Sequence, residues 1–68
     1  MQLSARNQLA GKVVSINQGE AIANVELDVA GQRLVASITV EAVEELGLEA
    51  GSEIVAVVKA SDVMIGVK

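Results

Sequence analysis

Three short polar segments carry the side chains in this sequence that could do chemistry. They are residues 4–8 (SARNQ), 37–39 (SIT) and 59–62 (KASD). Together they offer hydroxyl, guanidinium, ammonium and carboxamide groups, and a tight corner at 60–62 adds backbone N–H groups. A collection of neutral and positive hydrogen-bond donors is what an oxyanion requires. We therefore interpret the three segments as parts of a candidate anion-binding site.

A purely local explanation of the same residues stays open at this point. Serine and threonine are favoured at helix caps and turns because their hydroxyls hydrogen-bond to nearby backbone groups. Ser4, Thr39 and Ser61 could each serve such a role, and a polar stretch next to a chain end can simply be solvated. Residue types and spacing alone do not separate these two interpretations.

Enzymatic chemistry finds little support in the residue types present. The chain has no histidine and no cysteine, so it lacks the usual general base, the thiol nucleophile and the usual zinc ligands. A pairing of Ser4 or Ser61 with Lys59 is conceivable, but nothing else builds an acyl-transfer site. The carboxylates alternate along the expected strand and helix faces, as on a solvated surface. We expect no catalytic activity, no metal site and no disulfide.

The charge and composition argue against nucleic acid and membrane partners. The net charge is −4, the isoelectric point is near 4.5, and there is no aromatic side chain. Single-stranded nucleic acid is bound by aromatic stacking and a basic groove, and anionic membranes also require basic patches. No apolar run approaches the length of a membrane span. We expect a cytoplasmic protein.

The hydrophobic pattern predicts an all-β fold in a single domain of residues 1–68. Residues 23–29 alternate between apolar and polar, which is typical of a half-buried strand. A short helix with Thr39 as N-cap and Gly47 after its last turn follows the third strand. This order favours an OB-fold-like five-stranded barrel, although an open five-stranded sheet also fits. The expected strands are 9–16, 21–29, 33–38, 53–59 and 63–67, and the expected helix is 40–46.

Size and composition also predict self-association. A chain of 68 residues forms a marginal core, and small domains usually gain stability from a disulfide, a metal or a partner subunit. The first two are hard to supply here, yet 51% of the residues are hydrophobic. We expect homo-oligomerisation to bury part of this aliphatic surface.

Three longer motifs resemble the molbindins, the small molybdate-binding proteins of the Mop family. They are S-A-R-N-Q-L-x-G-K-V at 4–13, T-x-x-x-V-E-E-L-G-L at 39–48 and G-x-E-I-x-A-V-V-K-x-S-D-V-M at 51–64. The same unit forms the ligand-binding domain of molybdate-responsive regulators and occurs in molybdate transporter ATPases. The resemblance spans residues 3–65. One departure is Ala60, where some members have serine, so a hydroxyl is lost there.

The resemblance implies an OB-like barrel that assembles as a hexamer, a trimer of dimers, with oxyanion sites between subunits. It implies storage and homeostasis of molybdate, with tungstate accepted as a near-isostere, and no organic cofactor. Two other functions stay open: a sensing or interaction module that acts through a partner protein, and an OB module for another ligand. Motif matching assigns anion binding to Ser4, Ala5, Arg6, Asn7, Thr39, Lys59, Ala60 and Ser61.

Overall fold

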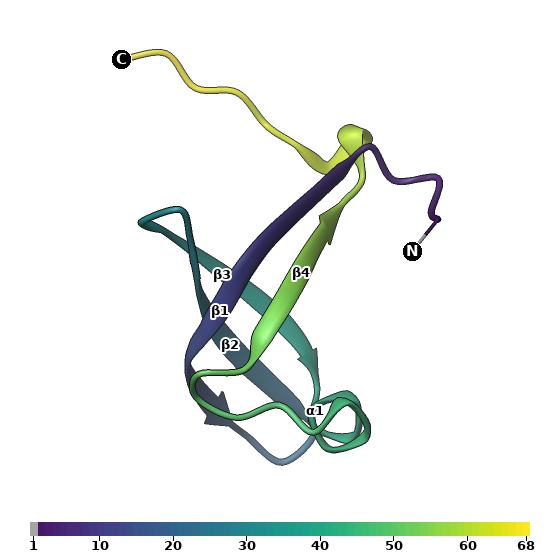
Figure 1. The fold of residues 1–68 in the computed structure, drawn as a ribbon, viewed down its shortest axis with the longest axis vertical. Coiled ribbons are helices and arrows are strands. Elements are labelled where there is room, and N and C mark those ends of the chain that lie inside the picture. The colour runs from purple at the N-terminus through teal and green to yellow at the C-terminus, as the bar shows by residue number, and fades with distance from the viewer. Residues whose placement is uncertain (1) are drawn as a thin grey trace.

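The computed structural model describes residues 2–68 and shows one antiparallel sheet with a short helix (Figure 1). The strand order is β3-β2-β1-β4, so β3 and β4 are the two edges of the sheet. A single 3-10 turn, η1, follows β4. The elements are β1 (Asn7–Gln18), β2 (Ile22–Val29), β3 (Gln32–Thr39), α1 (Val40–Leu46), β4 (Glu53–Val58) and η1 (Ala60–Asp62).

The long central strand β1 joins the two halves of the sheet. Its first half, from Asn7 to Lys12, pairs with β4, and the part from Lys12 to Gln18 pairs with β2. The register shifts between Val13 and Ser15, where a bulge increases the local twist. At this point the Val13 backbone exchanges two hydrogen bonds with the loop before β4, of 2.8 Å with Gly51 and 2.9 Å with Ser52. The bulge and this loop therefore curve the sheet around its own interior.

Gly11 lies where β2 passes closest to β1. A Cβ atom at this position would stand 2.6 Å from the backbone oxygen of Asp28 and 3.0 Å from a methyl of Val29. We expect Gly11→Ala to lower the free energy of unfolding by about 1–3 kcal/mol, because backbone would have to move. Urea denaturation at one protein concentration measures this. Gly66→Ala is the matched control, since its Cβ would meet nothing within 4 Å. Equal stability of the two variants would contradict the close approach.

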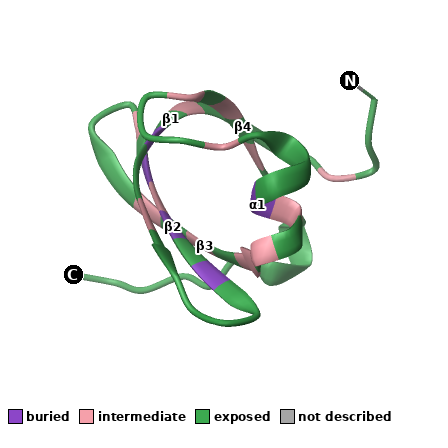
Figure 2. Cartoon of the chain, turned by 90° about the horizontal axis from the view of Figure 1, so that it is seen from below, coloured by how far each residue is buried: buried purple, intermediate pink, exposed green. Residues whose placement is uncertain are grey.

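The buried core is small and lies inside the curved sheet. Its members are Val13, Ala23, Val25, Leu27 and Val43, and none of the buried residues described is polar or charged. Figure 2 shows the strands and α1 around one interior, with the buried residues of β1, β2 and α1 on its walls. Helix α1 therefore serves mainly as a cover for one end of the curved sheet.

The structure confirms the predicted helix and both of its caps. The hydroxyl of Thr39 accepts a hydrogen bond from the Ala42 backbone N–H at 3.0 Å. Gly47 adopts a left-handed conformation with φ 62°, and its N–H donates to the carbonyl of Glu44. The β2–β3 hairpin is also as expected, with positive φ at Ala30 and Gly31 and an Asp28 carboxylate that accepts from the Gly31 N–H.

The prediction of a fifth strand at 63–67, and with it a closed barrel, is wrong for the described chain. Residues 63–68 form no strand, and the sheet of residues 7–58 has four strands and stays open. A strand exists only where its backbone groups find a neighbouring strand. Here the chain turns at η1 and runs away from the sheet (Figure 1). The tail, defined as residues 63–68, leaves Met64, Ile65 and Val67 between 89% and 96% exposed.

Candidate anion-binding site

Two of the three polar segments meet at one end of the sheet. The β1–β4 ladder has Asn7 opposite Val58 as its outermost pair. Residues 4–6 lead into β1 and residues 59–61 follow β4, so both segments extend from the same end (Figure 1). The structure therefore places Ser4, Ala5, Arg6 and Asn7 at the same end of the sheet as Lys59, Ala60 and Ser61, although more than fifty positions separate them in the sequence.

This end of the sheet holds two of the five basic residues. Arg6 and Lys59 contribute positive charge there, and Asp62 in η1 is the acid close by in sequence. Arg33 differs from them, because its Nε lies 2.8 Å from a carboxylate oxygen of Glu26 in an exposed ion pair. Since the chain as a whole carries −4, any attraction for an anion must be short-range and local.

The corner after β4 keeps backbone donors available. The N–H groups of Asp62 and Val63 donate to the carbonyls of Lys59 and Ala60, at 2.9 and 3.3 Å. The N–H groups of Ala60 and Ser61 open η1, and the first N–H groups of a helical turn have no acceptor inside that turn. The corner thus combines two amide donors, the Ser61 hydroxyl and the Lys59 ammonium over three residues.

Thr39 does not join this group within one chain. It ends β3 and caps α1, at the opposite end of the molecule from η1 (Figure 1). Its hydroxyl oxygen is used by the Ala42 N–H, while the hydroxyl proton remains free to donate. The local capping role that the sequence left open is therefore real for Thr39, and it is compatible with a contact to a ligand brought by another copy.

None of the eight candidate residues is buried. Ala5 and Asn7 are half-buried, and the other six are exposed. A fully exposed group of donors competes with water and gains little from each hydrogen bond. One chain thus supplies the donors but does not enclose an anion.

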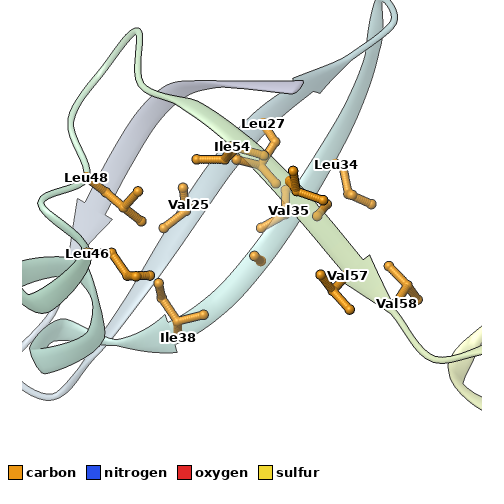
Figure 3. A pocket seen from close by; sticks show the side chains of 13 residues that line it. Val25, Leu27, Leu34, Val35, Ile38, Leu46, Leu48, Ile54, Val57 and Val58 are labelled. Carbon is orange, nitrogen blue, oxygen red and sulfur yellow. The ribbon is translucent and has the colours of Figure 1, made fainter. Parts of the chain in front are cut away.

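An aliphatic groove of about 430 Å³ is a feature that the sequence did not predict (Figure 3). It lies between β3 and β4, with β2 residues such as Val25 and Leu27 and the segment after α1 completing the walls. All thirteen lining side chains are hydrocarbon, so they offer an anion no donor. The groove instead suits another apolar segment. A sequence signal for it exists: β4 is apolar on both faces, with Val55 and Val57 exposed and Ile54 and Ala56 half-buried.

Other kinds of site find no support in the part of the chain that is described. No cluster of three acidic, histidine or cysteine side chains is placed to hold a metal ion within residues 2–68. In the same range, no helix combines the length and apolar character needed to cross a bilayer.

Comparison with known proteins identifies a family and several close relatives. The TOBE domain family matches residues 3–65. "Molybdenum-pterin-binding protein 2" of Clostridium pasteurianum is 52% identical over 66 residues, which cover 96% of this chain and 97% of that protein. A molybdate-binding protein from Sporomusa ovata has a solved structure that superposes with a TM-score of 0.92 at 37% identity, covering 96% of this chain and 97% of that one.

A molybdate-bound structure and two longer proteins match as well. The cytoplasmic molybdate-binding protein ModG, solved with molybdate, superposes with a TM-score of 0.85 at 43% identity, covering 88% of this chain and 43% of that one. "Molybdenum transport protein ModE" of Herbaspirillum seropedicae is 39% identical over 96% of this chain and 24% of its own length. "Molybdenum import ATP-binding protein ModC" of Brucella suis is 45% identical over 90% of this chain and 17% of its own length. These matches confirm the resemblance to the Mop proteins and to domains of both longer classes.

Proposed function

We propose that this chain, which belongs to the TOBE domain family, binds molybdate, with tungstate accepted as a near-isostere. The observation that carries the proposal is the meeting of residues 4–7 and 59–61 at one end of the β1–β4 ladder. The names of the relatives support it, since they are molybdenum-pterin-binding and molybdate-binding proteins. The biological role is storage and homeostasis of the anion in the cytoplasm, without catalysis.

The physical basis is a set of short hydrogen bonds around a tetrahedral dianion. Removing such an ion from water is costly unless donors replace its hydration shell. Hydrogen bonds with a charged partner contribute about 1.5–3 kcal/mol each. Six of them, even at about 1.5 kcal/mol each, exceed the ~8 kcal/mol that micromolar affinity requires. Ser4, Arg6, Lys59 and Ser61 supply side-chain donors, and the amides of Ala5, Asn7 and Ala60 add backbone donors.

We place the complete site between subunits of a homo-oligomer, a hexamer built as a trimer of dimers. Because all eight candidates are exposed or half-buried in one chain, a second copy is needed to exclude water from the anion. Thr39 lies at the other end of the folded molecule from residues 59–61, so it reaches the anion only as a residue of another copy. The acidic, aromatic-free composition favours no nucleic acid and no membrane as partner.

We propose that two copies associate through the groove and the tail. Residues 63–67 carry no charge, and their exposed apolar side chains include Val63, Met64, Ile65 and Val67. The groove is aliphatic throughout and lies between the two free sheet edges, β3 and β4. A tail from a second copy would fill the groove and pair its backbone with a free edge. Burial of these side chains provides the hydrophobic stabilisation that one small core lacks.

Calorimetric titration with sodium molybdate tests the proposed function. We expect saturable binding with a micromolar or tighter dissociation constant. Ser4→Ala removes one neutral donor and is expected to weaken binding by ~1–2 kcal/mol, about 5- to 30-fold. Ser52→Ala is the matched control, because the Ser52 hydroxyl accepts a hydrogen bond from the Glu49 N–H in its own turn and Ser52 is not one of the eight candidate residues. Absence of binding by the unmodified chain would refute the function, and equal affinity of both variants would remove Ser4 from the site.

A further inference from the structure

The corner at residues 59–61 combines two roles. It supplies Lys59, Ala60 and Ser61 as candidate anion ligands, and it sets the direction in which the tail leaves the sheet. Two hydrogen bonds from the Asp62 and Val63 N–H groups, of 2.9 and 3.3 Å, close its backbone turn. An anion that binds the corner must therefore also restrict the tail.

The tail depends on this corner for its position. Met64 is 94% exposed and Val67 96% exposed, so the described chain offers the tail almost no packing of its own. The direction of the tail follows from the backbone of Lys59–Ser61, which precedes Asp62 and the tail. A small rotation there moves the end of a six-residue extended tail by many ångströms, since each extended residue spans about 3.3 Å.

We propose that anion binding and docking of the tail onto a second copy are coupled through residues 59–61. An anion held by these residues fixes the corner in the direction that presents the tail to the groove of the second copy. A docked tail in turn holds the corner ordered, so the anion meets donors that are already placed. The first of the two binding events carries the entropic cost of ordering the corner, so the second event has the higher affinity. The inference rests on the proposed function and adds a regulatory property to the same site.

Coupling of this kind is reciprocal, which gives it a quantitative signature. If docking raises the affinity for the anion by some factor, the anion must strengthen the association of the chains by the same factor. Typical coupling factors in proteins lie between about 5 and 150. If the affinity for the anion did not depend on the tail, this factor would be one both for anion binding and for association of the chains.

Ile65→Asp tests the first direction. Ile65 is 89% exposed and is not one of the eight candidate ligands, so the variant leaves the donor set intact. A carboxylate in the tail cannot enter an aliphatic groove without a large desolvation penalty. We expect molybdate affinity, measured by calorimetry, to fall at least ~10-fold, a typical coupling factor. Gln32→Asp, exposed and outside the groove, is the control with the same change of charge, and Ile65→Leu is expected to retain affinity.

Sedimentation of the unmodified chain with and without molybdate tests the second direction, and it does not depend on whether any variant folds. We expect molybdate to lower the dissociation constant of the assembly by the factor that Ile65→Asp costs in affinity. If the unmodified chain binds molybdate and Ile65→Asp binds it equally well, the coupling is wrong and the proposed function stands. Association that molybdate leaves unchanged would also overturn the coupling. If the unmodified chain binds no molybdate, the proposed function itself fails.

Discussion

Lys59→Ala is expected to weaken molybdate binding by ~1.5–3 kcal/mol, which corresponds to a loss of about 10- to 150-fold in affinity. The ammonium is one of two positive groups at the end of the sheet where residues 4–7 and 59–61 meet. Its removal takes away a charge-assisted hydrogen bond that neutral donors cannot replace. Because Lys59 is exposed in the single chain, its loss is expected to change the stability of that chain by no more than ~0.5 kcal/mol.

Lys68→Ala is the matched control for this variant. It removes the same charge from an exposed lysine, but Lys68 is the last residue of the tail and is not one of the eight candidate residues. Both variants carry a net charge of −5, one unit below the −4 of the unmodified chain. Calorimetric titration of the three proteins at one ionic strength separates contact from long-range attraction. Equal weakening by both substitutions would mean that net charge, and not a contact from Lys59, governs the affinity.

Discrimination between oxyanions is the second large effect that we expect. Sulfate is also a tetrahedral dianion but is smaller than molybdate. A rigid set of donors placed for the larger ion leaves each hydrogen bond to sulfate too long, and hydrogen bonds weaken steeply with poor geometry. We expect molybdate and tungstate to bind at least ~100-fold tighter than sulfate, a difference of about 2.7 kcal/mol.

Competition calorimetry measures this difference. The protein is titrated with molybdate in the presence of increasing sulfate, and the apparent affinity gives the sulfate constant. Phosphate, at a pH where it is doubly charged, is a useful further competitor, because it has the charge of molybdate but not its size. Equal affinity for sulfate and molybdate would contradict an enclosed site and favour a simple positive patch.

Local sequence signals predicted most of the fold. Thr39 and Gly47 determine the ends of α1 through a hydroxyl cap and a left-handed residue, and both act within a few residues. The alternation of residues 23–29 gave β2, with Ala23, Val25 and Leu27 buried as one face requires. The strands differ from their predicted ends by one to two residues, since pairing extends β1 to Asn7–Gln18.

The tail shows why the fifth strand could not be predicted. Val63, Met64, Ile65 and Val67 have the composition of a strand, and composition was the basis of the prediction. A strand also requires a partner at hydrogen-bonding distance, and that depends on where η1 directs the chain. The groove could not be predicted for a related reason, because the distance between the two sheet edges depends on the curvature of the sheet, to which the bulge between Val13 and Ser15 contributes.

The residues of the candidate site could also be predicted only in part. Donor chemistry identified residues 4–8 and 59–62 from the sequence, and the β1–β4 ladder brings them to one end. Donor chemistry and motif matching grouped Thr39 with them, but in the structure it ends β3 and caps α1, at the other end of the molecule from η1 (Figure 1). Which residues meet across a boundary between copies is a property of the assembly, so no pattern within one chain encodes it directly.

Native mass spectrometry with and without added molybdate shows in one experiment whether copies of this chain assemble and hold molybdate between them. We expect masses at multiples of the 7.0 kDa chain, with the hexamer as the main species, and bound anions on the assembly only. A single folded 7.0 kDa species that carries no anion at saturating molybdate would contradict it.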